Sequence, residues 1–381
     1  MLWQLNLRHL RAMAAITRLG SISAAAQAVS ITQPAITQGL SKLETQLALT
    51  LFERQPGGMK ATPAAELFAA RVERALAHIG SPRVTTAQLR ALLAIAEAGS
   101  YPNAARLTGL AQPTLHRALG DLAIALRRPL LERRGKGISF TDAGRRTIRQ
   151  FRLARAELDA GLTELENLKG REVGRIVVGA MPLSRARVLP AAMAAFHARF
   201  PHARVAVSEG AFGELIEPLR DGEIDMMIGA LRDPSPGPDI QQQALFTDQP
   251  AIFGRKGHPL AGTAPDLAAL ARYPWVVPAP STPLYNQWRL MFESAGMALP
   301  DVPIECGSVI AIRQLLVATD FLTLLSPDQV AVELEAQWLV PVAETPARMS
   351  RTIGISTRTG WRPTALQAAF VQQLLQTVGK A

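Results

Sequence analysis

The sequence predicts a multidomain chain with three parts: two tandem all-α winged helix-turn-helix modules, a long linker helix, and an α/β domain of two subdomains. Three observations carry this prediction. One stretch of the chain repeats after a shift of 79 residues, a long amphipathic segment follows the second copy, and short apolar strands alternate with helical segments from Gly174 onward.

The basic charge of the chain lies almost entirely in its first part. Residues 1–170 contain 23 Lys and Arg against 12 Asp and Glu, whereas residues 171–381 contain 18 against 19. A basic module joined to a neutral one is the distribution expected of a nucleic-acid-binding protein. With 381 residues, 48% of them hydrophobic, the chain is also long enough for two or three packed domains.

Other classes of protein are disfavoured by what the sequence lacks. Cys306 is the single cysteine, so a disulfide framework is excluded and a reducing compartment is expected. The sequence shows no signal peptide and no apolar run of membrane-spanning length, so we expect a cytoplasmic protein without a membrane partner. The six histidines have no metal-ligand spacing, and no P-loop, nucleophile elbow or dinucleotide fingerprint occurs; we expect no metal, no cofactor and no enzyme activity.

The repeat needs no gap over nearly 60 residues, which chance does not produce. The matched positions include Leu10 with Leu89, Gly20-Ser21 with Gly99-Ser100, Ala25-Ala26 with Ala104-Ala105, Gln33-Pro34 with Gln112-Pro113, Leu40 with Leu119, Leu43 with Leu122, and Thr62 with Thr141. We assign residues 1–80 to the first copy and residues 81–141 to the second.

Each copy has the pattern of a winged helix-turn-helix. The expected helices cover residues 10–19, 24–29 and the segment from Gln33 in copy 1, and residues 89–98, 103–107 and the segment from Gln112 in copy 2. A short segment with Gly and basic residues follows and predicts a two-stranded wing. Pro102 and Gly109 interrupt the second helix of copy 2, so we expect that copy to be a weaker reader of DNA or an assembly element.

The third helix of each copy is the candidate for the major groove of DNA, with phosphate contacts from its flanks and wing. Gln can pair with adenine, Arg with guanine, and Thr can contact the thymine methyl. An ordinary solvated helix face is the alternative for any one position. The candidate residues are Ser21, Thr32, Gln33, Pro34, Thr37, Gln38, Lys42, Arg54 and Lys60 in copy 1, and Ser100, Gln112, Pro113, Thr114, His116, Arg117, Arg133, Arg134 and Lys136 in copy 2.

The two copies differ after their wings. Copy 1 opens a helix at Thr62-Pro63 that stops at Gly80, whereas copy 2 continues as one helix over residues 142–169, within the linker region that we assign to residues 142–170. The linker carries an apolar stripe at heptad spacing, formed by Ile148, Phe151, Leu158, Leu162 and Leu165. We expect this stripe to join two chains in a homodimer; packing on its own domain is the alternative. Gly161 weakens the helix prediction.

From residue 171 the alternation of strands and helices predicts a mostly parallel sheet in two subdomains, residues 171–251 with 346–381, and residues 252–345. Ligands of such sheets bind beyond the carboxyl ends of the strands, where helix N-termini favour anionic or hydroxylated molecules. Ordinary helix capping is the alternative for each turn. The candidate ligand-binding residues are Pro182, Ser184, Ala230, Ser281, Thr282, Gly307, Ser308 and Phe321.

Residues 5–62 resemble the winged helix-turn-helix of the LysR-type transcriptional regulators, through the run Thr32-Gln33-Pro34-Ala35-Ile36-Thr37 and through Leu51-Phe52-Glu53-Arg54. The run Gly257-His258-Pro259-Leu260 is similar to the effector domain of that family. The resemblance implies a homodimer or homotetramer that binds double-stranded promoter DNA, with RNA polymerase as a further partner. It also implies an inducer, such as a carboxylate, sugar or aromatic acid, between two subdomains of the periplasmic-binding-protein-like (type 2) fold.

The duplication departs from this family, whose members ordinarily carry one such module. We expect copy 2 to dock on the linker helix as the single module of the family does, and copy 1 to extend the DNA footprint. The alternatives are a solute-binding protein for transport, an enzyme, and a DNA binder that responds to no ligand. The basic front half and the missing signal peptide argue against the first, and the missing catalytic motifs against the second.

Overall fold

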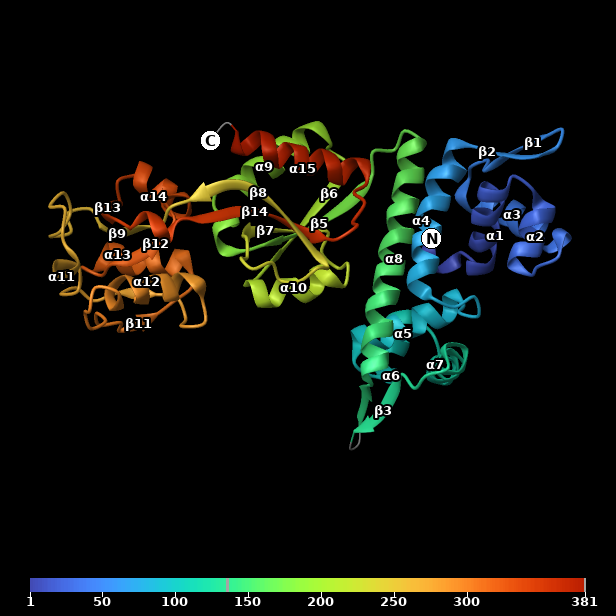
Figure 1. The fold of residues 1–381 in the computed structure, drawn as a ribbon, viewed down its shortest axis with the longest axis horizontal. Helices are drawn as coiled ribbons and strands as arrows, with labels where there is room; N and C mark the ends of the chain where they lie inside the picture. Colours follow the sequence, from blue (N-terminus) through green and yellow to red (C-terminus); the bar gives the residue numbers. More distant parts are fainter. Residues whose placement is uncertain (135–136, 380–381) are drawn as a thin grey trace.

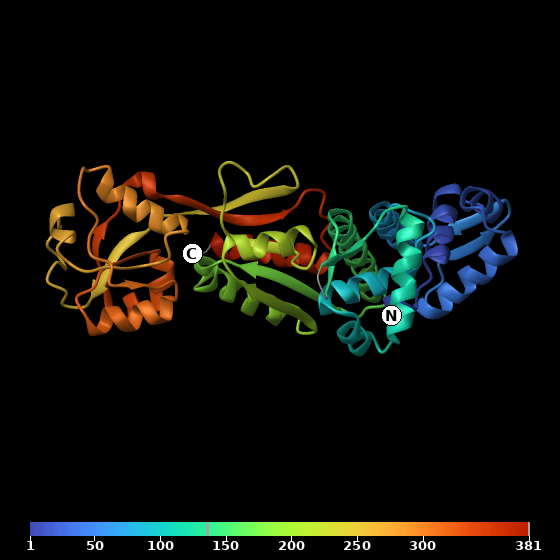
Figure 2. The ribbon, with the colours of Figure 1, turned by 90° about the horizontal axis from the view of Figure 1, so that it is seen from below.

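The computed structural model describes residues 1–134 and 137–379. Three bodies follow one another along its long axis (Figures 1 and 2): the N-terminal modules with two long helices, a central α/β subdomain, and a second α/β subdomain at the far end. No helix among the described residues combines the length and the apolar composition that a membrane crossing requires.

Copy 1 is a three-helix module with a wing and a long exit helix. After a short 3-10 helix, η1 (Leu2–Gln4), its elements are α1 (Leu7–Leu19), α2 (Ile22–Val29), α3 (Gln33–Leu47), β1 (Phe52–Gln55), β2 (Gly58–Ala61) and α4 (Pro63–Ile79). Gly20 ends α1 in the left-handed conformation that glycine favours. The predicted exit helix is confirmed, since Thr62 caps α4 and Gly80 ends it.

Copy 2 has the same order of elements: α5 (Thr86–Ala98), α6 (Tyr101–Thr108), α7 (Gln112–Leu126), β3 (Leu131–Arg134), β4 (Gly137–Phe140) and α8 (Asp142–Leu168). The expected disturbance of its second helix is wrong, because α6 is as long as α2, with eight residues each. Pro102 lies in the first turn, where its missing N–H costs no helical bond, and Gly109 is the C-cap. The first helix of each copy begins three residues earlier than expected.

The apolar stripe of α8 is covered by α4 of the same chain. Ile148, Phe151, Leu158 and Leu165 are buried in one core with the apolar residues of α4, and Leu162 packs against it half-buried. The expectation that this stripe joins two chains is therefore wrong, and the alternative of packing within the chain is correct. An apolar stripe of this spacing can pack against any helix with an apolar face, and in this fold that helix is α4.

The central subdomain has a five-stranded mixed sheet in the order β6-β5-β7-β14-β8. The helix α10 (Phe212–Arg220) packs on one face, and α9 (Val188–Arg199) and α15 (Ala365–Val378) pack on the other. Its strands are β5 (Gly174–Ala180), β6 (Ala203–Glu209), β7 (Met226–Ala230), β8 (Ile240–Asp248) and β14 (Arg351–Arg358).

The far subdomain combines an antiparallel sheet in the order β12-β9-β13 with a parallel pair, β10 and β11. Trp275, Trp288 and Phe292 form its aromatic core. Its elements are β9 (Ala251–Arg255), α11 (Leu267–Leu270), β10 (Val276–Val277), α12 (Pro283–Glu293), β11 (Ile304–Glu305), α13 (Val309–Ala318), β12 (Thr323–Leu325), η3 (Pro327–Val330), α14 (Ala331–Glu335), β13 (Leu339–Glu344) and η4 (Ala347–Met349).

The prediction of a mostly parallel sheet is wrong. Only β5 pairs in parallel with its two neighbours in the central sheet, whereas β14 is antiparallel to both β7 and β8. The reason is the connection between the subdomains: the chain leaves along β8 into β9 and returns from β13 into β14, so the outgoing and returning strands run side by side in opposite directions (Figure 1).

Candidate functional site

The exposed face of α3 carries most of the predicted DNA-contacting residues of copy 1. Thr32 at its start is exposed, as is the row that lines a shallow groove: Gln33, Pro34, Thr37, Gln38, Ser41 and Lys42. The opposite face of α3 is buried through Ile36, Leu40, Leu43 and Leu47. Burial of this apolar face fixes the orientation of α3, so the residues that line the groove face the solvent.

The corresponding groove on α7 is lined by Gln112, Pro113 and His116, and Thr114 and Arg117 are also exposed. The His116 ring stacks on Tyr101 of α6, with the ring centroids 3.8 Å apart and the planes 11° from parallel. Because Tyr101 is buried, this stacking fixes the orientation of the His116 ring. The site therefore includes Tyr101, which the sequence analysis did not select.

Ser21 and Ser100 have structural roles at the start of α2 and α6. Their side-chain oxygens accept hydrogen bonds from the backbone N–H groups of Ala24 and Asn103, and both serines are half-buried. Thr32 precedes α3 without such a bond. Capping therefore engages the two serines, while the hydroxyl of Thr32 makes no capping bond.

The wing of copy 1 presents Arg54 on β1 and Lys60 on β2, and both residues are exposed. This wing is tied to the helices because Met59 donates its N–H to the carbonyl of Gly20 at 2.8 Å. In copy 2, Arg133 and Arg134 belong to β3, whereas Lys136 lies outside the described residues. The first wing is thus a fixed extension of the α3 surface.

The predicted ligand-binding turns lie at the carboxyl edges of parallel strands. Ala230 ends β7, and the 3-10 helix η2 (Pro182–Arg185) follows β5 at the same edge of the central sheet. In the far subdomain, the turns at Thr282 and Ser308 follow the parallel pair β10 and β11. The two edges meet where η2 packs on η3, and Arg187 pairs there with Asp328 at 3.3 Å.

Inside these turns, several predicted residues already bond the backbone. Ser184 is buried, and its Oγ lies 2.9 Å from the carbonyl oxygen of Met181 and 3.1 Å from that of Ile228. The single hydroxyl hydrogen is shared between these two acceptors. Thr282 caps α12 and Ser308 caps α13, each through a side-chain oxygen that accepts a backbone N–H. The remaining predicted residues lie nearby: Pro182 and Gly307 are exposed, Ser281 precedes the α12 cap, and Phe321 packs half-buried in the core beside α13.

The crossover between the subdomains is held by a buried ionic cluster that the sequence analysis missed. The Asp248 carboxylate accepts from Ser326 Oγ at 2.5 Å and from Arg351 Nε at 2.7 Å. These residues come from the end of β8, the start of η3 and the start of β14. The cluster therefore joins the outgoing strand, the returning strand and the far subdomain at one point.

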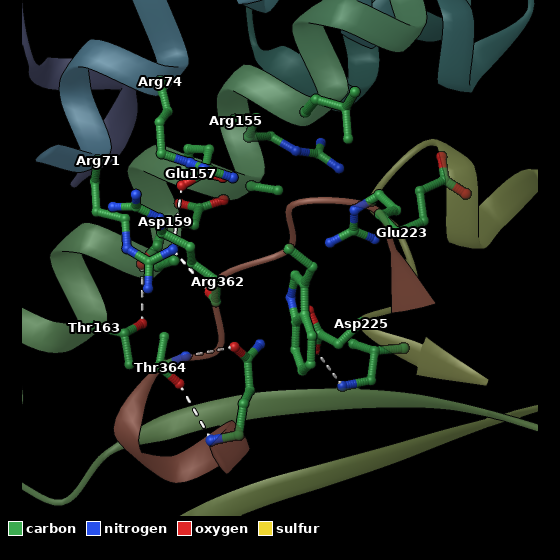
Figure 3. A pocket seen from close by; sticks show the side chains of 18 of the residues that line it. Arg71, Arg74, Arg155, Glu157, Asp159, Thr163, Glu223, Asp225, Arg362 and Thr364 are labelled. Carbon is green, nitrogen blue, oxygen red and sulfur yellow. Dashed lines mark hydrogen bonds and ion pairs between the residues drawn. The ribbon is translucent and has the colours of Figure 1, made fainter. Parts of the chain in front are cut away.

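A second missed site is a cavity of about 1010 Å³ between the long helices and the central subdomain (Figure 3). Arg71 of α4 is buried there and donates to Glu157 at 3.2 Å, to Glu164 at 2.6 Å and to the Arg362 carbonyl at 2.9 Å. Arg74 bonds Glu157 and the carbonyl of Gly360. The position of Arg71 within an apolar helix face is the sequence signal that could have located this network.

Arginines of α8 complete the attachment of the central subdomain. Arg149 and Arg152 both pair with Asp221, at the end of α10. Arg155 of α8 and Glu223 of the central subdomain both line the cavity (Figure 3). Both long helices are thus bonded to the same C-terminal domain.

Two carboxyl groups of this cavity have shifted pKa values. Burial raises the pKa of Asp159, against a smaller lowering effect of Arg155. Burial also raises the pKa of Asp225, although its Oδ2 accepts the Val177 N–H at 2.8 Å. Desolvation of the charged form outweighs the favourable contacts in both cases.

Two family descriptions match the chain. The LysR substrate binding domain matches residues 169–379. The bacterial regulatory helix-turn-helix protein, lysR family, matches twice, at residues 7–66 and 86–145. Each of these two matches covers the three helices and the wing of one copy.

Similar proteins are named as transcriptional regulators, not as enzymes. GalR of Pseudomonas putida, an HTH-type transcriptional regulator, is 31% identical over 98% of this chain and 97% of its own length. The SDS degradation transcriptional activation protein of a Pseudomonas species is 30% identical, over 72% of this chain and 90% of that protein. The second relative matches along most of its length and still leaves more than a quarter of this chain unmatched.

Solved structures share the fold. CbnR in complex with its target DNA has a TM-score of 0.54 at 21% identity, covering 76% of this chain and 98% of CbnR. LysG of Corynebacterium glutamicum with the bound effector Arg has a TM-score of 0.56 at 17% identity, covering 77% of this chain and 97% of LysG.

Proposed function

This chain belongs to the LysR family of bacterial transcriptional regulators, and we propose from this that both of its helix-turn-helix copies contact promoter DNA while a small molecule binds between its two C-terminal subdomains. The proposal divides the chain into residues 1–80, 81–141, 142–170 and 171–381, and it places the protein in the cytoplasm, where its DNA partner lies. RNA polymerase is proposed as a further partner.

The DNA contact is supported by the exposed polar faces of α3 and α7. Gln33, Gln38, Gln112 and Arg117 have the side chains that read base edges, and none of them is buried. Lys42, Arg54 and Lys60 add positive charge for phosphates beside α3. In copy 2, Arg133, Arg134 and Lys136 are proposed for the same role.

The ligand site is proposed at the meeting edges of the two subdomains, beside Ala230, Thr282 and Ser308. The N-termini of α12 and α13 point toward one edge, and such N-termini favour negative charge. A carboxylate is therefore the first ligand class to test, with sugars and aromatic acids next. Ser184 shapes this site through its backbone contacts, since its hydroxyl is engaged with carbonyl groups.

The path from ligand to DNA runs through the arginine network. Arg71 and Arg74 of α4, and Arg149 and Arg152 of α8, each bond the central subdomain. A ligand that favours one arrangement of the subdomains shifts the position of both helices by its differential affinity. A homodimer or homotetramer is proposed to form through surfaces other than the covered stripe of α8.

The observation that carries this proposal is the pair of outward-facing recognition helices on one basic region of the chain. The test is binding of the full-length protein to duplex fragments from its own upstream region, at several salt concentrations. We expect affinity to fall steeply with salt. A carboxylate, sugar and aromatic-acid panel, read by thermal shift and by DNA affinity, should contain a compound that changes both.

Two outcomes would reject parts of the proposal. Failure to bind any upstream fragment would reject the DNA contact by these residues. DNA affinity and melting temperature that are indifferent to every compound would favour a regulator that responds to no ligand. Thr282→Val is the matched variant for the ligand site: it should weaken the ligand response and leave DNA affinity without ligand unchanged.

A further inference from the structure

The helices α4 and α8 run antiparallel and fasten the two copies to each other. Arg71 on α4 pairs with Glu157 at 3.2 Å and with Glu164 at 2.6 Å on α8. Farther along α4, His78 bonds Gln150 at 2.8 Å. Higher numbers on α4 meet lower numbers on α8, which is the antiparallel arrangement visible in Figure 1.

Both helices present the same positions of the repeat to this contact, where each residue of copy 1 corresponds to the residue 79 positions later. Five corresponding pairs along these helices are buried in both copies: Phe68 and Thr147, Ala69 and Ile148, Val72 and Phe151, Ala75 and Ala154, and Ile79 and Leu158. Two equivalent surfaces that face each other in antiparallel fashion form an isologous interface, the kind that a twofold axis generates.

The polar contacts obey the same exchange. The repeat maps Arg71 onto Gln150 and Glu157 onto His78. Arg71 contacts Glu157, and the two mapped residues contact each other as well. Replacing each residue by its equivalent in the other copy therefore converts the Arg71–Glu157 contact into the His78–Gln150 contact. The point about which the two helices are related lies between Ala75 and Ala154, which are equivalent to each other. The long helices α4 and α8 are thus related by an internal pseudo-twofold axis, and each of them continues a copy that carries one recognition helix, α3 or α7.

We propose that one chain by itself occupies both halves of a bipartite operator, with α3 in one half-site and α7 in the other. The inference rests on the proposed function, namely DNA contact by both copies. A twofold pair of recognition helices matches inverted half-sites, spaced by one helical turn of DNA or a multiple of it. In Figures 1 and 2, α3 and α7 both lie on the side of α4 and α8 away from the C-terminal domain, which leaves this side open to DNA.

A second chain is not needed to provide two recognition helices, because α3 and α7 belong to the same chain. The stripe of α8 that would receive a second copy is covered by α4, and Phe151 and Leu158 are only 1% and 3% exposed. The partner that fits these two helices is therefore duplex DNA with two half-sites, and a two-chain complex on those half-sites is an outcome that the test distinguishes.

The two half-sites differ in sequence because the recognition helices differ. Both helices start with the same residues, Gln33-Pro34 and Gln112-Pro113. The next exposed positions differ: Thr37 with His116, Gln38 with Arg117, Ser41 with Gly120, and Lys42 with Asp121. A Gln favours adenine and an Arg favours guanine, whereas Asp121 repels phosphate where Lys42 attracts it. The operator is accordingly an imperfect inverted repeat.

The test uses the full-length chain on DNA from its own upstream region. Hydroxyl-radical footprinting should show two protected patches. Gln33→Ala with Lys42→Ala should erase one patch, and Gln112→Ala with Arg117→Ala should erase the other, each with about a 5- to 150-fold loss of affinity. All four side chains are exposed, so unchanged melting temperatures serve as the folding control.

Native mass spectrometry on the shortest duplex that holds both patches, at protein concentrations where the free chain is monomeric, should give one chain per duplex. Two chains on that duplex, or loss of the same patch in both double variants, would overturn the single-chain assignment while leaving DNA binding intact. A chain that binds no duplex at all would overturn the proposed function together with this inference, so the two failures are distinguishable.

Discussion

Ala75 and Ala154 occupy the same position in the two copies of the repeat, and both are fully buried in the core that α4 and α8 share. Their small side chains let the two helices come close at the centre of the pseudo-twofold axis. The interface that would join two chains in a symmetric dimer is thus closed within one chain, and both copies are held in a fixed relation to each other and to the C-terminal domain.

Close packing of α4 on α8 predicts that Gly161→Ala destabilises the protein. A Cβ at Gly161 would lie 2.8 Å from Cδ2 of Phe68 and 3.1 Å from Cβ of Arg71. We expect a loss of about 1–3 kcal/mol in the free energy of unfolding measured in urea. Gly120→Ala on the exposed face of α7 is the control, since nothing lies within 4 Å of its Cβ. It should stabilise by up to about 1 kcal/mol, and a similar gain at Gly161 would contradict the packing.

The fit of α3 on α1 predicts a defect confined to copy 1 for Gly39→Ala. A Cβ at Gly39 would lie 2.6 Å from Cδ2 of His9, so α3 or the His9 ring must move. We expect weaker protection of the copy 1 half-site in the footprint.

The repeat offers the rescue for this variant. Copy 2 has Gln88 and Ala118 at the positions of His9 and Gly39. Gly39→Ala combined with His9→Gln reproduces that pair and should restore the protection. A double variant as defective as the single one would show that the ring contact is not the cause.

The buried arginine of α4 predicts that Arg71→Met uncouples the domains. Its side chain is 7% exposed, and it pairs with Glu157 and Glu164. Removing one partner of a buried ionic group costs about 3–5 kcal/mol. Arg289→Met, which breaks the exposed pair with Glu293, is the control and should cost at most about 0.5 kcal/mol. Equal melting temperatures for the two variants would show that the ion pairs of Arg71 do not stabilise the protein.

The raised pKa of Asp225 predicts a specific pH dependence of stability. The folded protein holds the Asp225 proton more tightly than the unfolded chain, so the contribution of this group is present below the ordinary Asp pKa of about 3.9 and is lost as the pH rises through the raised pKa. The stability of the wild type relative to Asp225→Asn should therefore fall as the pH rises across this window and be constant above it. Urea unfolding at a series of pH values measures the difference, and a flat or rising difference would be evidence against the buried carboxyl.

The local elements of both copies were predictable because their signals are local. Gly20 and Gly99 end helices in the left-handed conformation, and Thr62 and Thr141 cap the long helices that follow. The error at α6 came from counting Pro102 as a helix breaker, although its place in the first turn makes it harmless.

The partners of these elements were harder to predict. The stripe on α8 looks the same whether it meets a second chain or α4, because apolar spacing encodes a surface and not the identity of what covers it. The antiparallel return of β14 was missed for a similar reason: a buried apolar strand has the same composition in either direction.

The candidate site shows the same division. Exposed polar positions on α3 and α7 follow from helical periodicity around a buried face, so Gln33 and Gln112 were found from their spacing alone. Ser184, Thr282 and Ser308 lie in turns between strands and helices as the sequence predicted, and their hydroxyl groups bond the backbone. The Arg71 and Asp248 clusters join residues from distant parts of the chain, which no spacing along it reveals.

Periodicity, capping residues and the repeat were enough to predict two helix-turn-helix modules, a long helix and an α/β domain, since each depends on neighbours a few positions apart. Which surfaces meet was settled only by the folded chain: α4 covers α8, and four arginines attach both helices to the central subdomain. The physical reason is that the hydrophobic effect is non-directional. The apolar stripe of a helix shows that this face will be buried, but the shape of the folded chain decides which element covers it.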